Sequence, residues 1–179
     1  MPTLDPAPSW AAWNHAQHGL WPRPEEGDID LNEVTGPDWI DHAGRCARNR
    51  LRAGTPKAVI GHCDWLASNV RWKGDELLVV HDWDSTAADS EAVLVGFAAA
   101  LHSTTSPDKH ATIEETGTFL DAYCDARGQP FSAEELQLSW AAGVWTRAYD
   151  AKYQHAAGEA VVSLSIQEAR ERLRRAGVG

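Results

Sequence analysis

The chain has 179 residues, of which 43% are hydrophobic and 23% are charged, and its formal net charge is −10. This length and composition are ordinary for one globular domain with its own core, so we expect residues 1–179 to form a single domain. The acidic balance argues against a nucleic-acid partner, because proteins that bind nucleic acids usually carry a basic face.

No apolar run approaches the ~20 residues that a membrane-spanning helix requires. The first residues, MPTLDPAPSW, have neither the basic region nor the apolar region of a signal peptide. The cysteines Cys46, Cys63 and Cys124 are widely spaced and odd in number, which favours reduced thiols over a disulfide framework. We therefore expect a cytoplasmic protein that contacts no membrane, and its oligomeric state stays open.

Two helices and one strand are expected in the first third of the chain. The spacing of apolar residues in SWAAWNHAQHGLW predicts a helix over 9–21, with Ser9 as its N-cap. A second apolar stripe predicts a helix over 36–51, and Pro37 suits its first position. The short apolar run AVIGH predicts a strand over 58–62.

A β-hairpin should follow, and then only helices. The segments NVRW, at 69–72, and ELLVVHDW, at 76–83, flank the turn KGDE. After Ser85 the pattern becomes helical, and Ser132 with Glu135 forms a predicted capping box. The expected helices lie near 89–103, 111–127, 132–157 and 165–176. The predicted fold class is therefore α+β, mainly helical, with a central β-hairpin.

Polar residues that could act in catalysis or bind a metal ion gather around this hairpin. The stretch GHCDWLASNVRW places His62, Asp64 and Asn69 before it, and VVHDWDS places Asp82 and Asp84 after it. Each of them singly is an ordinary turn residue, because Asp and Asn bond their own backbone. Together they match the order of the protein-kinase motifs H-R-D-L-x-x-x-N and D-F-G. Phosphoryl transfer needs a carboxylate beside the attacking hydroxyl and hard oxygen ligands for magnesium, which this pattern supplies.

The motif pair resembles the aminoglycoside phosphotransferase and choline-kinase-like family, whose usual pattern is H-G-D-x-x-x-x-N followed by a hairpin and I-D-W-[DE]. The resemblance covers residues 61–85, about one seventh of the chain. It implies the C-terminal lobe of a protein-kinase-like fold. It also implies transfer of the γ-phosphate of ATP or GTP to a hydroxyl of a small acceptor, which in this family is often amine-bearing.

The resemblance also implies roles for individual residues. Asp64 would be the catalytic base. Asn69 and Asp82 would bind Mg²⁺ and, through it, the nucleotide. His62 would brace the loop, and Asp84 would support the metal ligands. The acceptor stays open, because sugars, aminoglycosides, macrolides, choline and homoserine-like compounds share this motif set.

The sequence departs from the family pattern at several points. Cys63 stands where the family has Gly, so we expect a less free loop backbone. Asp89 is kept after the second motif, but Val and Leu replace a later Asp. The roughly sixty residues before His62 contain no Gly-rich turn between strands, and their only lysine, Lys57, is misplaced for a phosphate contact. We expect a C-terminal lobe without its nucleotide-binding lobe, nearly silent as a catalyst by itself.

Other interpretations remain open. A non-catalytic remnant or ligand-binding module with the same fold would carry the same residues. His62 and His81 with the nearby carboxylates could instead bind a transition metal. In the family, late helices line the acceptor pocket with acidic residues, although a solvated helix face would look the same. The acidic residues on the late helices here are Glu114, Glu115, Asp121, Asp125, Glu134, Glu135 and Asp150.

Overall fold

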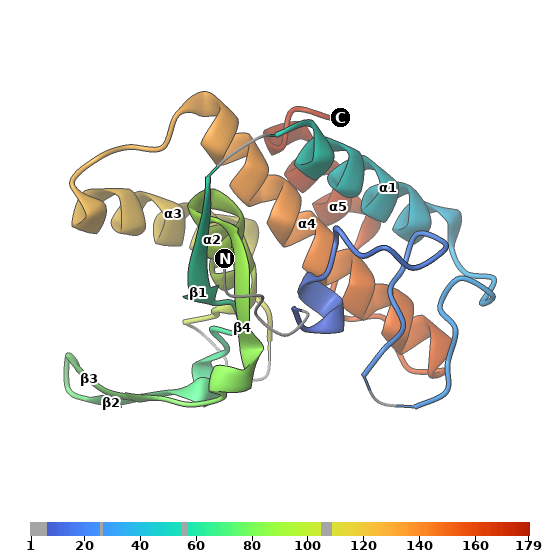
Figure 1. Ribbon diagram of the computed structural model, residues 1–179, viewed down its shortest axis with the longest axis horizontal. Coiled ribbons are helices and arrows are strands. Elements are labelled where there is room, and N and C mark those ends of the chain that lie inside the picture. The colour runs from blue at the N-terminus through green and yellow to red at the C-terminus, as the bar shows by residue number, and fades with distance from the viewer. Residues whose placement is uncertain (1–6, 26, 55–56, 105–108) are drawn as a thin grey trace.

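The computed structural model describes residues 7–25, 27–54, 57–104 and 109–179. Within them the chain forms five α-helices and four β-strands (Figure 1). The helices are α1 Asp38–Ala53, α2 Glu91–Leu101, α3 Ile113–Arg127, α4 Ala133–Ala156 and α5 Ile166–Arg175. The strands are β1 Ala58–His62, β2 Val70–Lys73, β3 Glu76–Val80 and β4 Thr86–Ser90. The fold is therefore α+β, with two small antiparallel sheets.

Helix α4 is the centre of the molecule and packs against α1, α2 and α5. Helix α2 is apolar on all sides, and every one of its residues after Glu91 is buried, as expected of a helix enclosed by its neighbours. It approaches α4 closely at Gly96, where an added Cβ would lie 2.3 Å from the backbone oxygen of Ser139. The glycine therefore permits the contact between these two helices.

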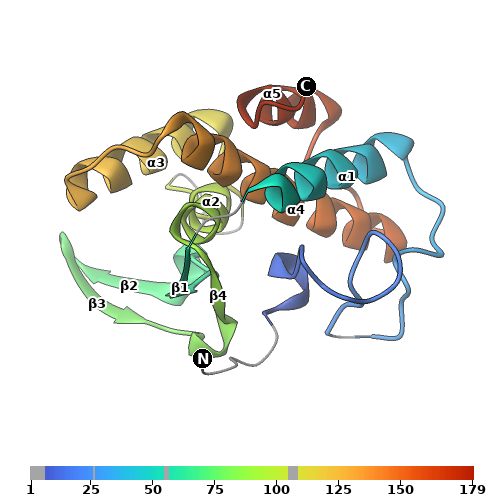
Figure 2. The same ribbon diagram turned by 45° about the horizontal axis from the view of Figure 1, so that its top comes forward.

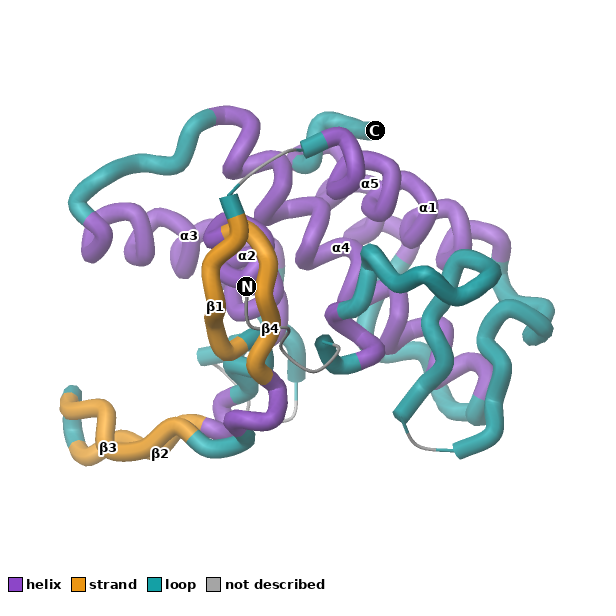
Figure 3. Tube along the Cα trace, viewed as in Figure 1, coloured by secondary structure: helices purple, strands orange, loops and turns teal. Residues whose placement is uncertain are grey.

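The strands form two separate pairs (Figure 3). Strand β1 pairs with β4 and brings His62 opposite Thr86. Strand β2 pairs with β3 and brings Val70 opposite Val80. The pair β1–β4 lies beside α2, while the hairpin β2–β3 extends from the base of that pair and lies below α3 in both views (Figures 1 and 2). Residues 63–85, which include the hairpin, therefore form one long connection between the paired strands β1 and β4.

Most predicted elements are confirmed, including the strand over 58–62, the hairpin and the later helices. The capping box at Ser132 and Glu135 is present. The prediction that the chain becomes helical directly after Ser85 is wrong, because Thr86–Ser90 forms β4. This strand is stabilised by backbone hydrogen bonds to β1, and the local sequence alone does not indicate them.

The predicted helix over 9–21 is also wrong. Only Ser9–Ala11 forms a short 3-10 turn, and Ser9 lies inside it instead of capping a helix. The buried side chain of Arg48 on α1 donates hydrogen bonds to backbone oxygens of this segment, namely those of Trp13, His15, Gly19 and Leu20. These carbonyl groups serve Arg48 and are not arranged as in a helix, so a tertiary contact overrides the apolar spacing.

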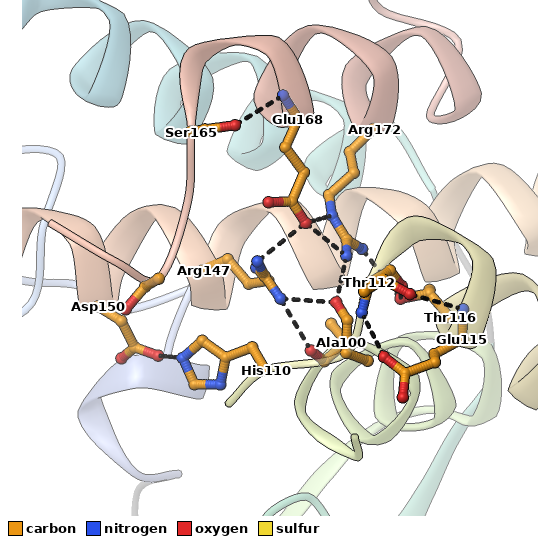
Figure 4. A network of polar contacts seen from close by, with 12 residues as sticks. Ala100, His110, Thr112, Glu115, Thr116, Arg147, Asp150, Ser165, Glu168 and Arg172 are labelled. Carbon is orange, nitrogen blue, oxygen red and sulfur yellow. Dashed lines mark hydrogen bonds and ion pairs between the residues drawn. The ribbon is translucent and has the colours of Figure 1, made fainter. Parts of the chain in front are cut away.

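A buried polar network joins α4, α5 and the residues before α3 (Figure 4). Glu168 Oε1 accepts hydrogen bonds from Arg172 and pairs with Arg147 at 2.9 Å. Arg147 and Arg172 also donate to the backbone oxygen of Ala111. The network fixes α5 on the helical core.

None of the helices in the described part of the chain combines the length and the apolar character that a membrane-spanning segment needs.

Candidate active site

The two polar motifs meet because β1 ends at one and β4 begins at the other. His62 is the last residue of β1, and the residue opposite it, Thr86, directly follows the second motif. Cys63 reinforces this closure, since its backbone N–H and its thiol both donate to the backbone oxygen of Ser85, at 3.0 and 2.8 Å. The strand pair thereby holds residues 63–69 beside residues 81–85.

Cys63 occupies its place in the loop without backbone strain. It is fully buried, and its φ is not positive, because Asp82 is the single non-glycine residue with positive φ in the described part of the chain. Burial, followed by the nearby charge of Asp64, raises the pKa of the Cys63 thiol to about 12. The thiol is therefore protonated, and it packs in the core while it ties the loop to the second motif. We expected a less free loop backbone at Cys63, and the backbone there is not in a strained conformation.

His62 connects the two motifs through backbone groups. Its Nδ1 accepts a hydrogen bond from the N–H of Asp64 at 3.1 Å, so the proton lies on Nε2, which donates to the oxygen of His81 at 2.8 Å. The rings of Trp65 and Trp83 contact the imidazole. Both nitrogens are thus engaged, and the group of His81 that meets them is its carbonyl. This arrangement does not support a transition-metal site built on His62 and His81, because both ring nitrogens of His62 are already hydrogen-bonded.

Asp64 and Asn69 are in direct contact. Asn69 Nδ2 donates to Asp64 Oδ2 at 2.9 Å and to the Asp64 backbone oxygen at 3.3 Å. The backbone oxygen of Asn69 accepts from the N–H of His81 at 2.8 Å, which closes the base of the hairpin. Asn69 directly precedes β2. With its amide nitrogen turned to Asp64, its side-chain oxygen is left for another partner.

Asp82 adopts an unusual backbone conformation, with φ 65° and ψ 45°. Asp and Asn visit this left-handed region more readily than other non-glycine residues. The backbone oxygen of Asp82 accepts from the N–H of Ser85 at 3.1 Å, which forms a tight turn after β3. This turn places Asp82 and Asp84 beside Asp64.

A polar pocket of about 400 Å³ joins these carboxylates; it is lined by Pro8, Trp10, Glu25, Asp64, Asp82, Asp84 and Ser85. Burial, and then the charge of Asp82, raises the pKa of Asp64 above its ordinary value. No Lys, Arg or His of the described residues forms an ion pair with Asp64, Asp82 or Asp84. Among the described residues, the pocket therefore concentrates negative charge that no protein cation pairs with.

The predicted site residues come together in part. Asp64 contacts Asn69, and Asp64 shares the pocket with Asp82. Within the described residues, no group of three or more His, Cys, Asp or Glu side chains is arranged to hold a metal ion. The predicted ligands are of another kind, one carboxylate and one amide oxygen, so magnesium binding stays a prediction.

Three residues of this pocket were not anticipated from the sequence, Pro8, Trp10 and Glu25. The N-terminal segment reaches the site because Trp13 Nε1 donates to Asp89 on β4 at 2.6 Å. Glu25 Oε1 in turn accepts from the N–H of Ser9 at 2.8 Å. Asp89, the acidic residue kept after the second motif, thus anchors this segment. No local sequence signal indicates such contacts between distant parts of the chain.

The acidic residues of the late helices do not line this pocket. Glu115 and Glu135 close the capping boxes of α3 and α4. Asp150 pairs with His110 at 2.9 Å. Helix capping and the contact with His110 therefore account for these three residues.

Comparisons with known protein families, with curated proteins and with solved structures found no match.

Proposed function

We propose that this chain is a phosphotransferase lobe of the aminoglycoside phosphotransferase and choline-kinase-like type. In this proposal it transfers the γ-phosphate of ATP or GTP to a hydroxyl of a small acceptor. The observation that carries it is the pocket in which Asp64 and Asp82, from two separate motifs, face one space while Asn69 orients Asp64. The pairing of β1 with β4 around the hairpin β2–β3 supports a kinase-like C-terminal lobe.

Asp64 is suited to the role of base. Its raised pKa makes the carboxylate a better proton acceptor than an exposed Asp, and a base works best with a pKa close to the working pH. The hydrogen bond from Asn69 fixes one carboxylate oxygen, and in this proposal the other accepts the hydrogen bond of the acceptor hydroxyl. Positioning of this kind supplies much of the catalysis in phosphoryl transfer.

The site suits a hard divalent cation. Carboxylate and amide oxygens are the ligands that Mg²⁺ prefers. The mutual repulsion of Asp64 and Asp82, with no protein cation paired to either among the described residues, is the electrostatic situation that a bound cation relieves. Asp82 and Asn69 would hold Mg²⁺, whose charge would neutralise the phosphates of the nucleotide.

A second candidate function is ligand binding without catalysis. In the described ranges 7–25 and 27–54 there is no strand pair that could carry a loop over the phosphates. The γ-phosphate would therefore need positioning groups from elsewhere. For this reason we expect the 179-residue chain alone to turn over nucleotide slowly or not at all.

Magnesium binding tests the site without requiring turnover. Titration calorimetry with MgCl₂ should show a single site that Asp82→Asn weakens at least tenfold, because the substitution removes one ligand charge. Asp75→Asn, in the exposed turn of the hairpin, is the matched control and should bind like the parent chain. Equal Mg²⁺ affinity in all three proteins would reject Asp82 as a ligand.

A turnover assay tests the assignment of the base. Nucleotide hydrolysis and acceptor phosphorylation are measured with amino-sugar and amino-alcohol acceptors, on this chain and on any longer product of the same reading frame. Acceptor-dependent activity should fall at least ~100-fold in Asp64→Asn, the scale of general-base catalysis. Undiminished activity of Asp64→Asn would rule out Asp64, and rapid turnover by the 179-residue chain would contradict the need for added positioning groups.

A further inference from the structure

A second pocket lies next to the loop that carries Asp64, and Trp65 of that loop lines it. It has a volume of about 450 Å³, and β1, the hairpin, α2 and α3 supply its walls. Aromatic rings line it from three places: Trp65 from the loop, Trp72 from β2, and Phe119 with Tyr123 from α3. Pockets of this volume with apolar and aromatic walls are typical of small-molecule sites.

Exposed apolar side chains gather at its mouth. Val59, Ile60 and Trp72 all line the pocket, and Ile60 and Trp72 keep 58% and 55% of their surface exposed. Apolar surface that is both exposed and concave marks a binding site more often than single scattered residues do. Because the walls come from four elements, the site is a hollow and not a flat face.

The pocket presents no net charge to an occupant. Its one carboxylate, Glu91, pairs with Arg127 at 2.9 Å and accepts a hydrogen bond from the hydroxyl of Tyr123 at 2.8 Å. Burial, followed by this hydrogen bond, raises the pKa of Tyr123 to about 12, so the phenol stays protonated. A charged ligand would lose its hydration here without gaining a counter-charge.

His102 offers a polar atom for recognition. His102 lines the pocket, and its Nδ1 lies 3.1 Å from the backbone oxygen of Trp65. Because a carbonyl only accepts, Nδ1 carries the proton, and in the neutral ring Nε2 is a hydrogen-bond acceptor. Among the described residues no partner of Nε2 is found. A ligand with one hydroxyl or N–H group beside its ring would complement it.

We propose that this pocket binds a small, uncharged aromatic molecule that carries a hydrogen-bond donor. The proposal does not rest on the phosphotransferase assignment. It rests on the aromatic walls, the exposed apolar mouth, the neutralised Glu91 and the available nitrogen of His102.

Fluorescence titration with 2-naphthol, a neutral fused ring with one hydroxyl, tests the proposal. We expect saturable binding to one site, and at least tenfold weaker binding of naphthalene-2-sulfonate, which has the same rings but a negative charge. Ile60→Glu places a charge at the mouth and should weaken 2-naphthol binding at least tenfold. Its exposed position makes loss of folding unexpected, and circular dichroism checks this.

Val162→Glu is the matched control, because Val162 is 77% exposed and lies outside the pocket. It should bind 2-naphthol within twofold of the parent chain. Unsaturable binding, equal binding of the sulfonate, or equal losses in both variants would overturn the proposal. So would sedimentation showing a dimer that Ile60→Glu dissociates, since a second copy of the chain would then cover the pocket.

Discussion

Removal of the Glu168 carboxylate should destabilise the protein strongly. One oxygen of this side chain lies 2.9 Å from nitrogens of both Arg147 and Arg172 (Figure 4). The side chains of these arginines are 5% and 0% exposed, so neither can recover hydration in place. Burial already lowers the pKa of Arg147 to about 10. In Glu168→Ala, two buried cations would lose the carboxylate that they share.

Breaking a buried ion pair by removing one partner costs about 3–5 kcal/mol. For a chain of this length, each kcal/mol lowers the melting temperature by roughly 2–4 °C. Glu168→Ala should therefore melt ~6–20 °C below the parent chain in a thermal scan followed by circular dichroism. Urea unfolding at 25 °C should give a correspondingly lower midpoint with an unchanged slope.

Glu171→Ala on the same helix is the control. Glu171 pairs with Arg174 and Arg175, which are exposed to solvent, and exposed ion pairs contribute little to stability. This variant should melt close to the parent chain. If the two glutamate variants melted at the same temperature, the reasoning from burial of the two arginines would be refuted.

Three further predictions concern other parts of the fold. Gly96→Ala should cost about 2 kcal/mol or more in urea unfolding, because its Cβ would overlap the backbone of Ser139. Gly117→Ala, a helical site whose nearest neighbour lies 3.9 Å from an added Cβ, should instead stabilise by about 0.5–1 kcal/mol; the reverse order would contradict the packing of α2 on α4. The thiol of Cys63, with its pKa raised to about 12 by burial, should resist a disulfide reagent at pH 8 while the other two thiols react; mass spectrometry of the modified peptides decides this. Asp64→Asn should be more stable than the parent chain at pH 7, because a raised carboxyl pKa gives stability at low pH that is lost as the pH rises through the raised value. The difference in urea midpoint should disappear well below pH 3.8, the ordinary Asp value, and a constant difference would show that charge is not its cause.

The sequence predicted those elements whose signals are local. The strand over 58–62 and the capping box at Ser132 depend on neighbouring residues alone, and both are confirmed. The hairpin and its two motifs are likewise continuous in sequence, and this is why Asp64, Asn69 and Asp82 could be singled out.

What escaped prediction depends on distant contacts. Strand β4 has small and polar residues and becomes a strand because β1 pairs with it. The segment before α1 has helical apolar spacing, but Arg48 draws its carbonyl groups to itself. Trp10 and Glu25 enter the pocket of Asp64 only through such long-range bonds. The apolar periodicity of a segment does not indicate which distant residues will contact it.

The left-handed backbone at Asp82 has a consequence for any mutational dissection of this protein. Alanine in that conformation carries a steric cost of about 1–2 kcal/mol that Asn and Asp largely escape. A routine alanine scan would therefore reshape the turn after β3 while it removed the carboxylate, and the two losses would be recorded as one. Asparagine keeps the turn and removes only the charge. The same constraint restricts which residues can replace Asp82 in any variant that still folds its second motif against its first.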